Sequence, residues 1–400
     1  MTSGSLEAGQ QPVSSNMRWR DRLLDWKHRL IARPGFQRWA ARFPLTRRLS
    51  SRRANELFNI AAGFVYSQVL AACVELRLLE ILRDGPLAAR ELARRCELDP
   101  EAMLCLLRAA ASLELLSDRG GQRFGLGDLG AAMLGNPGVA AMVQHHRHLY
   151  ADLADPIKVL QREQPTALSR FWPYATASEG DVTPYSDLMS ASQSLVANDI
   201  LDQVPMQGTR HLWDIAGGDG TFIRSALARW PSLKATVLDL EGVAGLAQQR
   251  LAEARLAGRA RALSGDMFRA PLQGQAPAPS EATTPVTLAA DFGPPDLVSL
   301  VRVVHDHDDA DVMTLFEALY QSMQDGAQLL IAEPMAGTPG AEAMGHAYFG
   351  LYLRAMGSGR PRTASEIGAM LAAAGFSHIR EINTPRPLLV RIIIAQRQES

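Results

Sequence analysis

The stretch between residues 211 and 239 constrains the fold of this 400-residue chain more than any other part of it. A short apolar segment around Asp214 leads into a turn of small residues at 216–220. A helical pattern follows and ends at Pro231, because proline cannot continue a helix, and a second apolar segment then leads to Asp239. This order of strand, glycine-rich turn, helix, strand and acid is typical of a parallel α/β sheet that binds a nucleotide.

The turn and Asp239 together predict a cofactor that contains adenosine. A carboxylate at the end of the second strand can accept hydrogen bonds from both hydroxyls of a ribose, and small residues let the backbone approach the ligand. The chain has Ile223 where a dinucleotide fingerprint has its third glycine, and Asp214 and Asp219 add negative charge near the turn. Both features favour the sulfonium of S-adenosylmethionine over a pyrophosphate. A dinucleotide site or an ordinary acidic turn is the alternative, because a lone glycine-rich loop is weakly specific.

Two later segments add polar groups at the same edge of the predicted sheet. Asp266 and Met267 follow the next strand, where the acid can bind the exocyclic amine of adenine and the thioether can cover its face. A surface aspartate beside a core methionine explains the same pair. Residues 296–304 then indicate a buried parallel strand that ends at His305. Because ligands bind at the carboxyl ends of such strands, His305, with an ordinary pKa of about 6.5, is a candidate general base.

The sequence around His305 also allows other interpretations. The string H-D-H-D-D at 305–309 resembles the H-x-H-x-D-H motif of metal-dependent hydrolases, so a metal site built on His305, Asp306 and His307 is an alternative. Against it, Ala310 replaces the final histidine of that motif, and no second cluster of ligands is evident. The aspartates of the string can also simply cap the helix that is predicted to follow.

Glu333 stands at the end of the next predicted strand, at 327–332. Its carboxylate can hydrogen-bond the imidazole of His305, fix the tautomer of the ring and stabilise the imidazolium. Because Pro334 follows directly, an ordinary turn residue is the alternative.

Over roughly residues 55 to 395, these motifs resemble the plant-type S-adenosylmethionine-dependent O-methyltransferases. The likeness lies in a loop of the D-x-G-G-G-x-G type at 214–220, the acid at 238–240, a G-D-M-F turn at 265–268, and the strand-end histidine and glutamate. It implies that His305 is the catalytic base and that Glu333 orients it. It also implies a site for S-adenosylmethionine formed by Asp214, Ala216, Gly217, Gly218, Asp239, Leu240, Asp266, Met267 and Phe268.

Within this family the chain most resembles the bacterial O-methyltransferases of carotenoid biosynthesis, and the segments at 63–69 and 302–308 carry that likeness. The resemblance implies methylation of the tertiary C-1 hydroxyl of an acyclic carotenoid such as hydroxyneurosporene or demethylspheroidene. It also implies an acceptor pocket lined by Phe171, Trp172, Tyr348, Phe349, Tyr352 and Met356. Aromatic and methionine side chains suit a long apolar acceptor, although they are more often simple core.

The chain departs from the family pattern at three places. Ala216 replaces the first glycine of the loop, and Val301 and Arg302 stand where plant members often carry lysine and tryptophan. Pro361 occupies the place of a second catalytic-site glutamate. We therefore expect a single carboxylate to hold the catalytic base.

The resemblance implies an α/β fold with two domains. Residues 201–400 are expected to form a Rossmann-like methyltransferase domain with a mixed, mostly parallel sheet, and residues 54–140 an α-helical, winged-helix-like dimerisation domain. A helical linker at 141–200 is expected to contribute to the acceptor pocket. The stretch at 269–295, rich in Ala, Pro and Thr, is expected to be a flexible surface insertion.

The winged-helix pattern at 87–112 raises the alternative of a transcriptional regulator with a ligand-sensing α/β domain. However, the helix that would read DNA, at 100–110, is apolar and nearly devoid of cations, so it is poorly suited to phosphates or base edges. The net charge of −1 likewise gives no reason to expect nucleic acid. We expect this helix to pack against its neighbours and the domain to form a homodimer.

The N-terminal extension at 1–53 has a composition of its own, and its first 16 residues are expected to be disordered. Its remaining part interleaves aromatic residues with the basic residues Arg18, Arg20, Arg22, Lys27, Arg29, Arg33, Arg38, Arg42, Arg47, Arg48, Arg52 and Arg53. Such a segment suits an anionic membrane surface, and an arm around a partner subunit explains it equally well.

The cysteines and the apolar runs bear on the location of the protein. Cys73, Cys96 and Cys105 lack the spacing of a zinc site or a disulfide, which favours reduced thiols. No apolar run is expected to reach transmembrane length, and no signal peptide is visible. We therefore expect a cytoplasmic protein, peripheral to the photosynthetic membrane.

Overall fold

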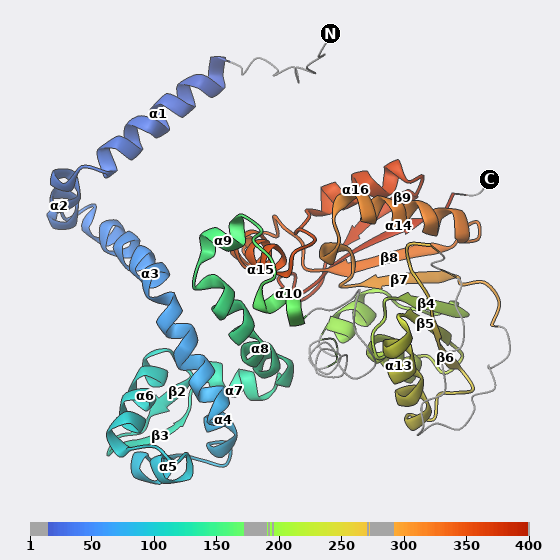
Figure 1. Ribbon diagram of the computed structural model, residues 1–400. Helices are drawn as coiled ribbons and strands as arrows, with labels where there is room; N and C mark the ends of the chain where they lie inside the picture. The colour runs from blue at the N-terminus through green and yellow to red at the C-terminus, as the bar shows by residue number, and fades with distance from the viewer. Residues whose placement is uncertain are drawn as a thin grey trace. The chain divides into compact units, whose positions relative to one another are not determined.

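The computed structural model describes residues 15–171, 190, 193, 196–269, 272 and 292–398. The chain forms two compact units, Met1–Ala72 and Cys73–Ser400 (Figure 1). Residues 1–14, Trp172 and most of the predicted insertion at 269–295 lie outside the described residues.

The first unit consists of helices with little core of their own. α1 (Ser15–Ile31) and α2 (Pro34–Arg42) precede α3 (Arg47–Glu75), and Pro34 begins α2 because its fixed φ suits a first helical turn. Among the residues of this unit whose side chains are described, Ala40 alone is buried.

α3 corrects one expectation from the sequence. It contains an 18-residue window with a mean hydropathy of 1.7, of which 11% is buried, so it is long and apolar enough to cross a membrane by length and composition. The expectation that no apolar run reaches transmembrane length is therefore wrong, because the few polar residues within this helix do not lower its mean hydropathy enough.

The second unit begins with a small winged-helix-like region. It comprises α4 (Leu78–Ile81), β1 (Leu87–Ala88), α5 (Ala89–Arg95), α6 (Pro100–Ser112), β2 (Leu116–Asp118), β3 (Arg123–Leu126) and α7 (Asp128–Leu134), with an antiparallel sheet in the order β1-β3-β2. Asp99 caps α6 by accepting hydrogen bonds from the backbone of Glu101 and Ala102. α6 buries Met103 and Leu107, so this helix packs as expected.

The described part of the connection to the large sheet includes the helices α8 (Pro137–Leu153), α9 (Pro156–Leu160) and α10 (Ala167–Phe171). Asp152 near the end of α8 accepts hydrogen bonds from the backbone N–H groups of Ala167 and Leu168, at 2.6 and 2.9 Å, and so fixes the start of α10. Each of α8, α9 and α10 packs against α15 (Gly350–Met356), which lies far along the sequence.

The large sheet has seven strands in the order β6-β5-β4-β7-β8-β10-β9. Five strands are parallel: β4 (His211–Ile215), β5 (Lys234–Asp239), β6 (Ala260–Ser264), β7 (Leu297–Val301) and β8 (Gln328–Glu333). β10 (Arg391–Gln396) lies antiparallel between β8 and β9 (Ser377–Ile382). The chain leaves β4 towards β5 and returns to its other side at β7, so the ends of β4 and β7 form a topological switch point, where ligands bind.

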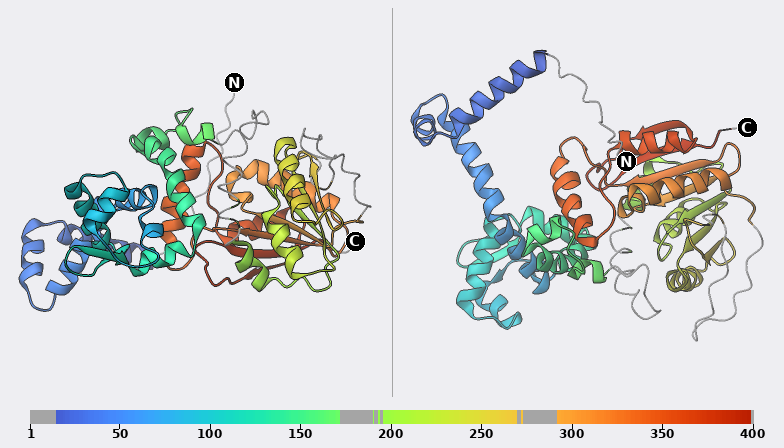
Figure 2. Two further views of the ribbon diagram at one scale, coloured as in Figure 1. Left: turned by 90° about the horizontal axis from the view of Figure 1, so that it is seen from below. Right: turned by 45° about the horizontal axis from the view of Figure 1, so that its top comes forward.

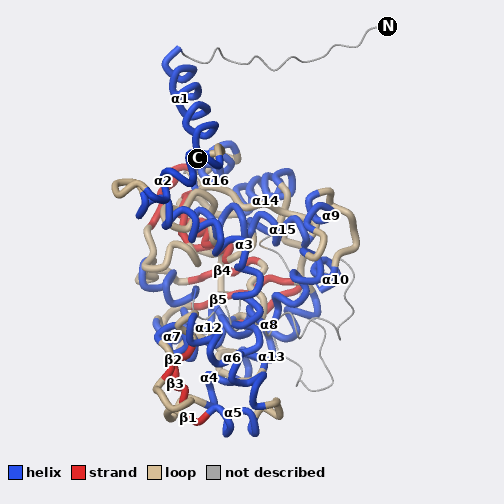
Figure 3. Tube along the Cα trace, turned by 90° about the vertical axis from the view of Figure 1, so that its left-hand side faces the viewer, coloured by secondary structure: helices blue, strands red, loops and turns tan. Residues whose placement is uncertain are grey.

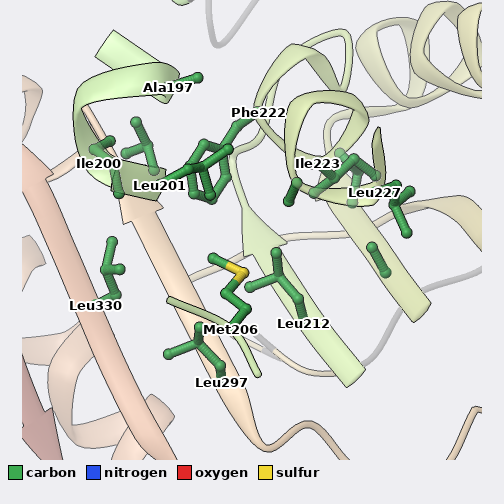
Figure 4. Packing of buried hydrophobic residues seen from close by; sticks show 14 of the residues in the cluster. Ala197, Ile200, Leu201, Met206, Leu212, Phe222, Ile223, Leu227, Leu297 and Leu330 are labelled. Atoms are coloured by element: carbon green, nitrogen blue, oxygen red, sulfur yellow. The ribbon is translucent and has the colours of Figure 1, made fainter. Parts of the chain in front are cut away.

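Helices cover both faces of this sheet (Figures 2 and 3). α12 (Thr221–Arg229) and α13 (Glu241–Glu253) pack on one face, and α14 (Asp309–Ser322) and α16 (Ala364–Ala373) pack on the other. Figure 4 shows side chains of α12 and of residues 197–206 against the central strands. β4 and β7 are buried along their whole length, which is why apolar residues dominate both strands. The predicted fold class is confirmed.

Candidate active site

The turn after β4 is shaped by three backbone features. Ala216 has a φ of 52°, in the left-handed region, and its N–H donates to the carbonyl of Leu238 at 2.7 Å. A Cβ on Gly217 would lie 2.5 Å from Oδ2 of Asp214, so only glycine fits there. The alanine that replaces the family glycine thus keeps the turn, at a conformational cost of about 1–2 kcal/mol.

Asp239 closes the turn from the end of β5. Its carboxylate accepts hydrogen bonds from the N–H groups of Gly218 and Leu240, both at 2.8 Å. Burial raises the pKa of Asp239 to about 6, although these two hydrogen bonds oppose the rise. The acid is therefore fixed beside the loop at the place where the sequence predicts a ribose.

Asp214 lies beneath the turn. It is fully buried, and its Oδ1 accepts a hydrogen bond from Oγ of Ser299 at 2.6 Å. Burial raises the pKa of Asp214 to about 7, and the nearby charge of Asp239 adds to the rise. Asp214 does not line the cavity described below, so the structure places it as a support for the loop.

Asp219 has a different environment from the one the sequence suggests. It accepts hydrogen bonds from Nη1 of Arg250 at 2.6 Å and from Oγ1 of Thr221 at 2.7 Å, and Arg224 forms a further ion pair with it. Burial alone would raise the pKa of Asp219, but Thr221 and the two arginines hold it below its usual value. Its negative charge is therefore compensated by the two arginines.

A cavity of about 420 Å³ lies along the carboxyl ends of β4, β5, β6 and β7. Eight of the nine predicted cofactor residues line it: Ala216, Gly217, Gly218, Asp239, Leu240, Asp266, Met267 and Phe268. Sequence reasoning missed further lining residues, namely Ser190, Gln193, Asp219, Leu238, Val243, Gly265, Val301, Arg302, Val303, Asp306 and His307. The last five lie between the final residue of β7 and position 307, and their place at a strand end is the signal that could have found them.

His305 lies in a short 3₁₀ turn, η1 (Val304–Asp306), directly after β7. It is 5% exposed, and its Nδ1 lies 3.3 Å from Oε2 of Glu333 at the end of β8. The same oxygen of Glu333 accepts the backbone N–H of His305 at 3.0 Å. One buried carboxylate therefore holds both the ring and the main chain of the histidine, as the sequence predicts for this pair.

A second carboxylate lies on the other side of the ring. Nε2 of His305 is 3.2 Å from Oδ1 of Asp306. This oxygen of Asp306 makes no hydrogen bond within the described residues, so the hydrogen bond to the imidazole comes from Glu333, and Asp306 adds a nearby negative charge. Burial would lower the pKa of His305, but Asp306 and Glu333 outweigh it and raise the pKa above its ordinary value.

Metal binding was the alternative for this cluster. Among the residues that the structure describes, no group of three or more His, Cys, Asp or Glu side chains is placed to hold a metal ion. His307 instead packs edge-on against Phe268, with 5.1 Å between the ring centroids.

An aromatic cluster faces His305 from the π-helical turn η2 (Met344–Phe349) and from α15. The ring of Phe349 lies 5.8 Å from the ring of His305. Tyr352 and Met356 are buried in the same cluster, and Phe171 packs on its α8 side. The structure thus brings together five of the six predicted acceptor residues, and Trp172 lies outside the described residues.

Two histidines of α8 belong to this cluster and were missed from the sequence. Nε2 of His145 lies 2.8 Å from the hydroxyl of Tyr352, and Nε2 of His146 lies 2.7 Å from the hydroxyl of Tyr348. Burial lowers the pKa of His145 to about 4 and raises the pKa of Tyr348 to about 12. Both groups are therefore uncharged near neutral pH.

Comparisons with known proteins show the family to which the chain belongs. Residues 150–279 and 288–377 match an O-methyltransferase domain, and residues 58–136 match an O-methyltransferase dimerisation domain. Demethylspheroidene O-methyltransferase of Cereibacter sphaeroides is 40% identical over 374 residues, which cover 92% of this chain and 94% of the relative. The enzyme of the same name from Rhodobacter capsulatus is 36% identical over 361 residues, covering 89% and 85%.

Solved structures show the same fold. Human N-acetylserotonin methyltransferase in complex with SAM superposes with a TM-score of 0.69 at 22% identity, covering 87% of this chain and 98% of that chain. The loop at 216–218, the acid at the end of β5 and the Asp266–Met267 pair surround one cavity, and together they fit the methionine, ribose and adenine parts of one ligand. The chain belongs to the O-methyltransferase family and is an S-adenosylmethionine-dependent methyltransferase.

Proposed function

We propose that this protein methylates a hydroxyl of an acyclic carotenoid, of the hydroxyneurosporene or demethylspheroidene type. The observation that carries the proposal is the buried pair of His305 and Glu333, which lies between the cofactor cavity and an aromatic wall. The neighbour Asp306 lines the cavity, and Phe349 faces the imidazole. The names of the two bacterial relatives supply the substrate class, and the uncharged aromatic cluster is suited to a long apolar acceptor.

Bound S-adenosylmethionine supplies an electrophilic methyl group on its sulfonium. The protein then has to align the acceptor oxygen with that carbon and to remove the hydroxyl proton. With Nδ1–H donated to Glu333, Nε2 of His305 is the nitrogen that accepts the proton, and the two carboxylates stabilise the imidazolium. A tertiary alcohol is a far weaker acid than imidazolium, so proton removal has to accompany methyl transfer in a site closed to water.

The test measures transfer of label from S-adenosylmethionine to hydroxylated acyclic carotenoids. We expect the wild-type protein to methylate a tertiary C-1 alcohol, and His305→Ala to lower turnover by about 10²–10⁴-fold, because the base is lost. Binding of S-adenosylhomocysteine, measured by calorimetry, should stay within a few fold, since His305 does not line the cavity.

His378→Ala is the matched control, because His378 is an exposed histidine on β9, away from the cavity. It should keep wild-type turnover. Undiminished turnover by His305→Ala would contradict the assignment of the base, and methylation of none of the carotenoid alcohols would contradict the acceptor class.

We also propose that three consecutive parts of the chain have different roles. Residues 54–140 pair two subunits, residues 141–200 complete the acceptor pocket, and residues 201–400 bind the cofactor and carry out the chemistry. The dimerisation match supports the first assignment, and the contacts of α8 with η2 and α15 support the second.

The N-terminal extension is proposed to contact an anionic membrane surface, peripheral to the photosynthetic membrane and on its cytoplasmic side. On α1, Trp19, Leu23 and Trp26 follow the spacing of one helical face and are 55%, 55% and 59% exposed. Arginines and a lysine occupy other positions of the same helix. A basic helix with an exposed aromatic face is suited to lie in the headgroup region of an anionic bilayer, which is where a lipid-soluble acceptor is found.

A further inference from the structure

The backbone of the catalytic turn is held by one distant segment, residues 358–362. Oγ of Ser358 donates to the carbonyl of Asp306 at 2.9 Å, and the N–H of Arg360 donates to the carbonyl of His305 at 3.0 Å. Gly359 lies directly against these carbonyls with a φ of 79°, so no side chain fits there. The turn that carries the base therefore does not depend on its own short 3₁₀ geometry alone.

Arg362 supplies the remaining contacts of this segment. Its Nη1 donates to the carbonyl of Val304 and its Nη2 to the carbonyl of His307, both at 2.8 Å. The four consecutive carbonyls from Val304 to His307 thus each accept a hydrogen bond from residues 358–362.

The guanidinium of Arg362 is fully buried, at 0% exposure. Its Nε and Nη2 donate to Oδ1 of Asp309 at 2.9 and 2.6 Å, in the first turn of α14. A buried arginine is tolerated only when its charge and its donors are matched, and here carbonyls and a carboxylate match them. The rigid fork of the guanidinium reaches Val304, His307 and Asp309 at once, which lysine cannot do.

The backbone of Arg362 also reaches the other half of the catalytic pair. Its carbonyl accepts the N–H of Ala336 at 2.9 Å, three residues after Glu333. The next residue, Thr363, is the N-cap of α16 and forms a capping box with Glu366. Arg362 is thus anchored to a helix start and connects the turn of His305 with the segment that follows Glu333.

We propose that Arg362 is a positioning residue for the methyl-transfer reaction, which holds His305 at hydrogen-bonding distance from Glu333 by fixing the catalytic turn to the segment after β8. The proposal rests on the role of His305 as the base. The distance from Nδ1 of His305 to Oε2 of Glu333 is 3.3 Å, so a shift of the turn by 1 Å breaks this contact. The charged groups that act on the imidazole are Asp306 and Glu333, which raise its pKa, and Arg302, which lowers it. His307 also lies close to it.

The test is Arg362→Lys, which keeps the positive charge but removes the planar guanidinium that reaches several acceptors at once. We expect kcat to fall about 10–100-fold while the acceptor KM and the affinity for S-adenosylhomocysteine change less than about threefold. The pH midpoint of kcat should move down, because a looser contact with Glu333 stabilises the imidazolium less. The matched control is Arg210→Lys, the same substitution at an arginine that is 81% exposed and pairs with Asp296 at the amino end of β4, away from the catalytic turn. It should keep the wild-type kcat and pH midpoint.

A second readout does not depend on turnover. The imidazole of His305, labelled at carbon and titrated by NMR with S-adenosylhomocysteine bound, should show a lower pKa in Arg362→Lys than in the wild type and in Arg210→Lys. Absence of carotenoid methylation by the wild-type protein would contradict the proposed function and leave this titration as the test of positioning.

A folded Arg362→Lys protein with wild-type kcat and an unchanged His305 titration overturns the proposal. If the lysine variant fails to fold, Ser358→Ala takes its place, because it removes only the hydrogen bond to the carbonyl of Asp306. It should lower kcat a few fold and move the pH midpoint in the same direction, and an unchanged profile would also overturn the proposal.

Discussion

At the scale of single residues, we expect Asp239 to make cofactor binding depend on pH. Its pKa of about 6 is raised by burial, and only the ionised carboxylate accepts hydrogen bonds from both ribose hydroxyls. As the pH falls from 7 to 5, the ionised fraction falls about tenfold, and the Kd of S-adenosylhomocysteine should rise by the same factor. Calorimetry across this range measures it.

Asp239→Asn is the control for this titration. It should bind weakly and with little pH dependence, whereas a pH dependence like that of the wild type would assign the titration to another group.

The stability of the fold should depend on pH in the opposite direction to cofactor binding. Asp214 and Asp239 have folded-state pKa values of about 7 and about 6, above the ordinary value of about 3.9. The folded protein therefore binds these protons more tightly than the unfolded chain, and these two groups make the protein without cofactor more stable as the pH falls towards 4.

At the scale of elements, the contact between α8 and η2 depends on a hydrogen bond between two partly buried side chains. Tyr348→Phe removes the hydroxyl that lies 2.7 Å from Nε2 of His146 and leaves that nitrogen without this partner. We expect a loss of about 1–3 kcal/mol in the free energy of unfolding, measured with urea. Because η2 carries the wall that faces His305, the acceptor KM should rise while the affinity for the cofactor stays unchanged.

A double-mutant cycle controls for the loss of size and packing. The double variant His146→Phe with Tyr348→Phe pairs two apolar rings, so it should recover most of the stability that each single variant loses. Additive losses would show that the two side chains do not interact in solution.

Elements whose pattern is local were predictable from the sequence. Pro231 and the small residues at 216–220 place the end of α12 and the turn after β4, and the acid at the end of β5 follows the same pattern. Arg362 shows why other parts of the site were not. It contacts Val304 from 58 residues away, and no local pattern indicates such a pairing. The π-helical turn depends on Gly345 lying against the backbone of Ala336, and Asp306 reaches His305 only because of the 3₁₀ turn.

At the scale of the whole molecule, the exposed apolar residues gather in the first unit and at the start of the dimerisation domain. On α3, Leu57, Phe58, Ile60 and Phe64 are 70%, 72%, 80% and 73% exposed. The dimerisation match begins at residue 58, so a second copy of the chain is the expected cover for this part of α3. The aromatic residues of α1 lie outside that match. Dimerisation therefore does not account for their exposure, and we expect them to contact a membrane surface.

The test of that surface uses full-length variants and sedimentation with vesicles of phosphatidylglycerol or phosphatidylcholine. Trp19→Ala with Trp26→Ala should weaken binding to phosphatidylglycerol by about ten- to a hundredfold, because two aromatic side chains no longer enter the interface. Ile157→Ala with Leu160→Ala is the control, since these residues are also exposed, at 58% and 49%, and lie outside the dimerisation match. Added salt should weaken the binding of the parent protein, because arginines and lysines attract the anionic surface. Equal pelleting of the tryptophan variant and the parent would rule out membrane contact through α1, and a change in the mass of the oligomer instead would assign α1 to the partner subunit.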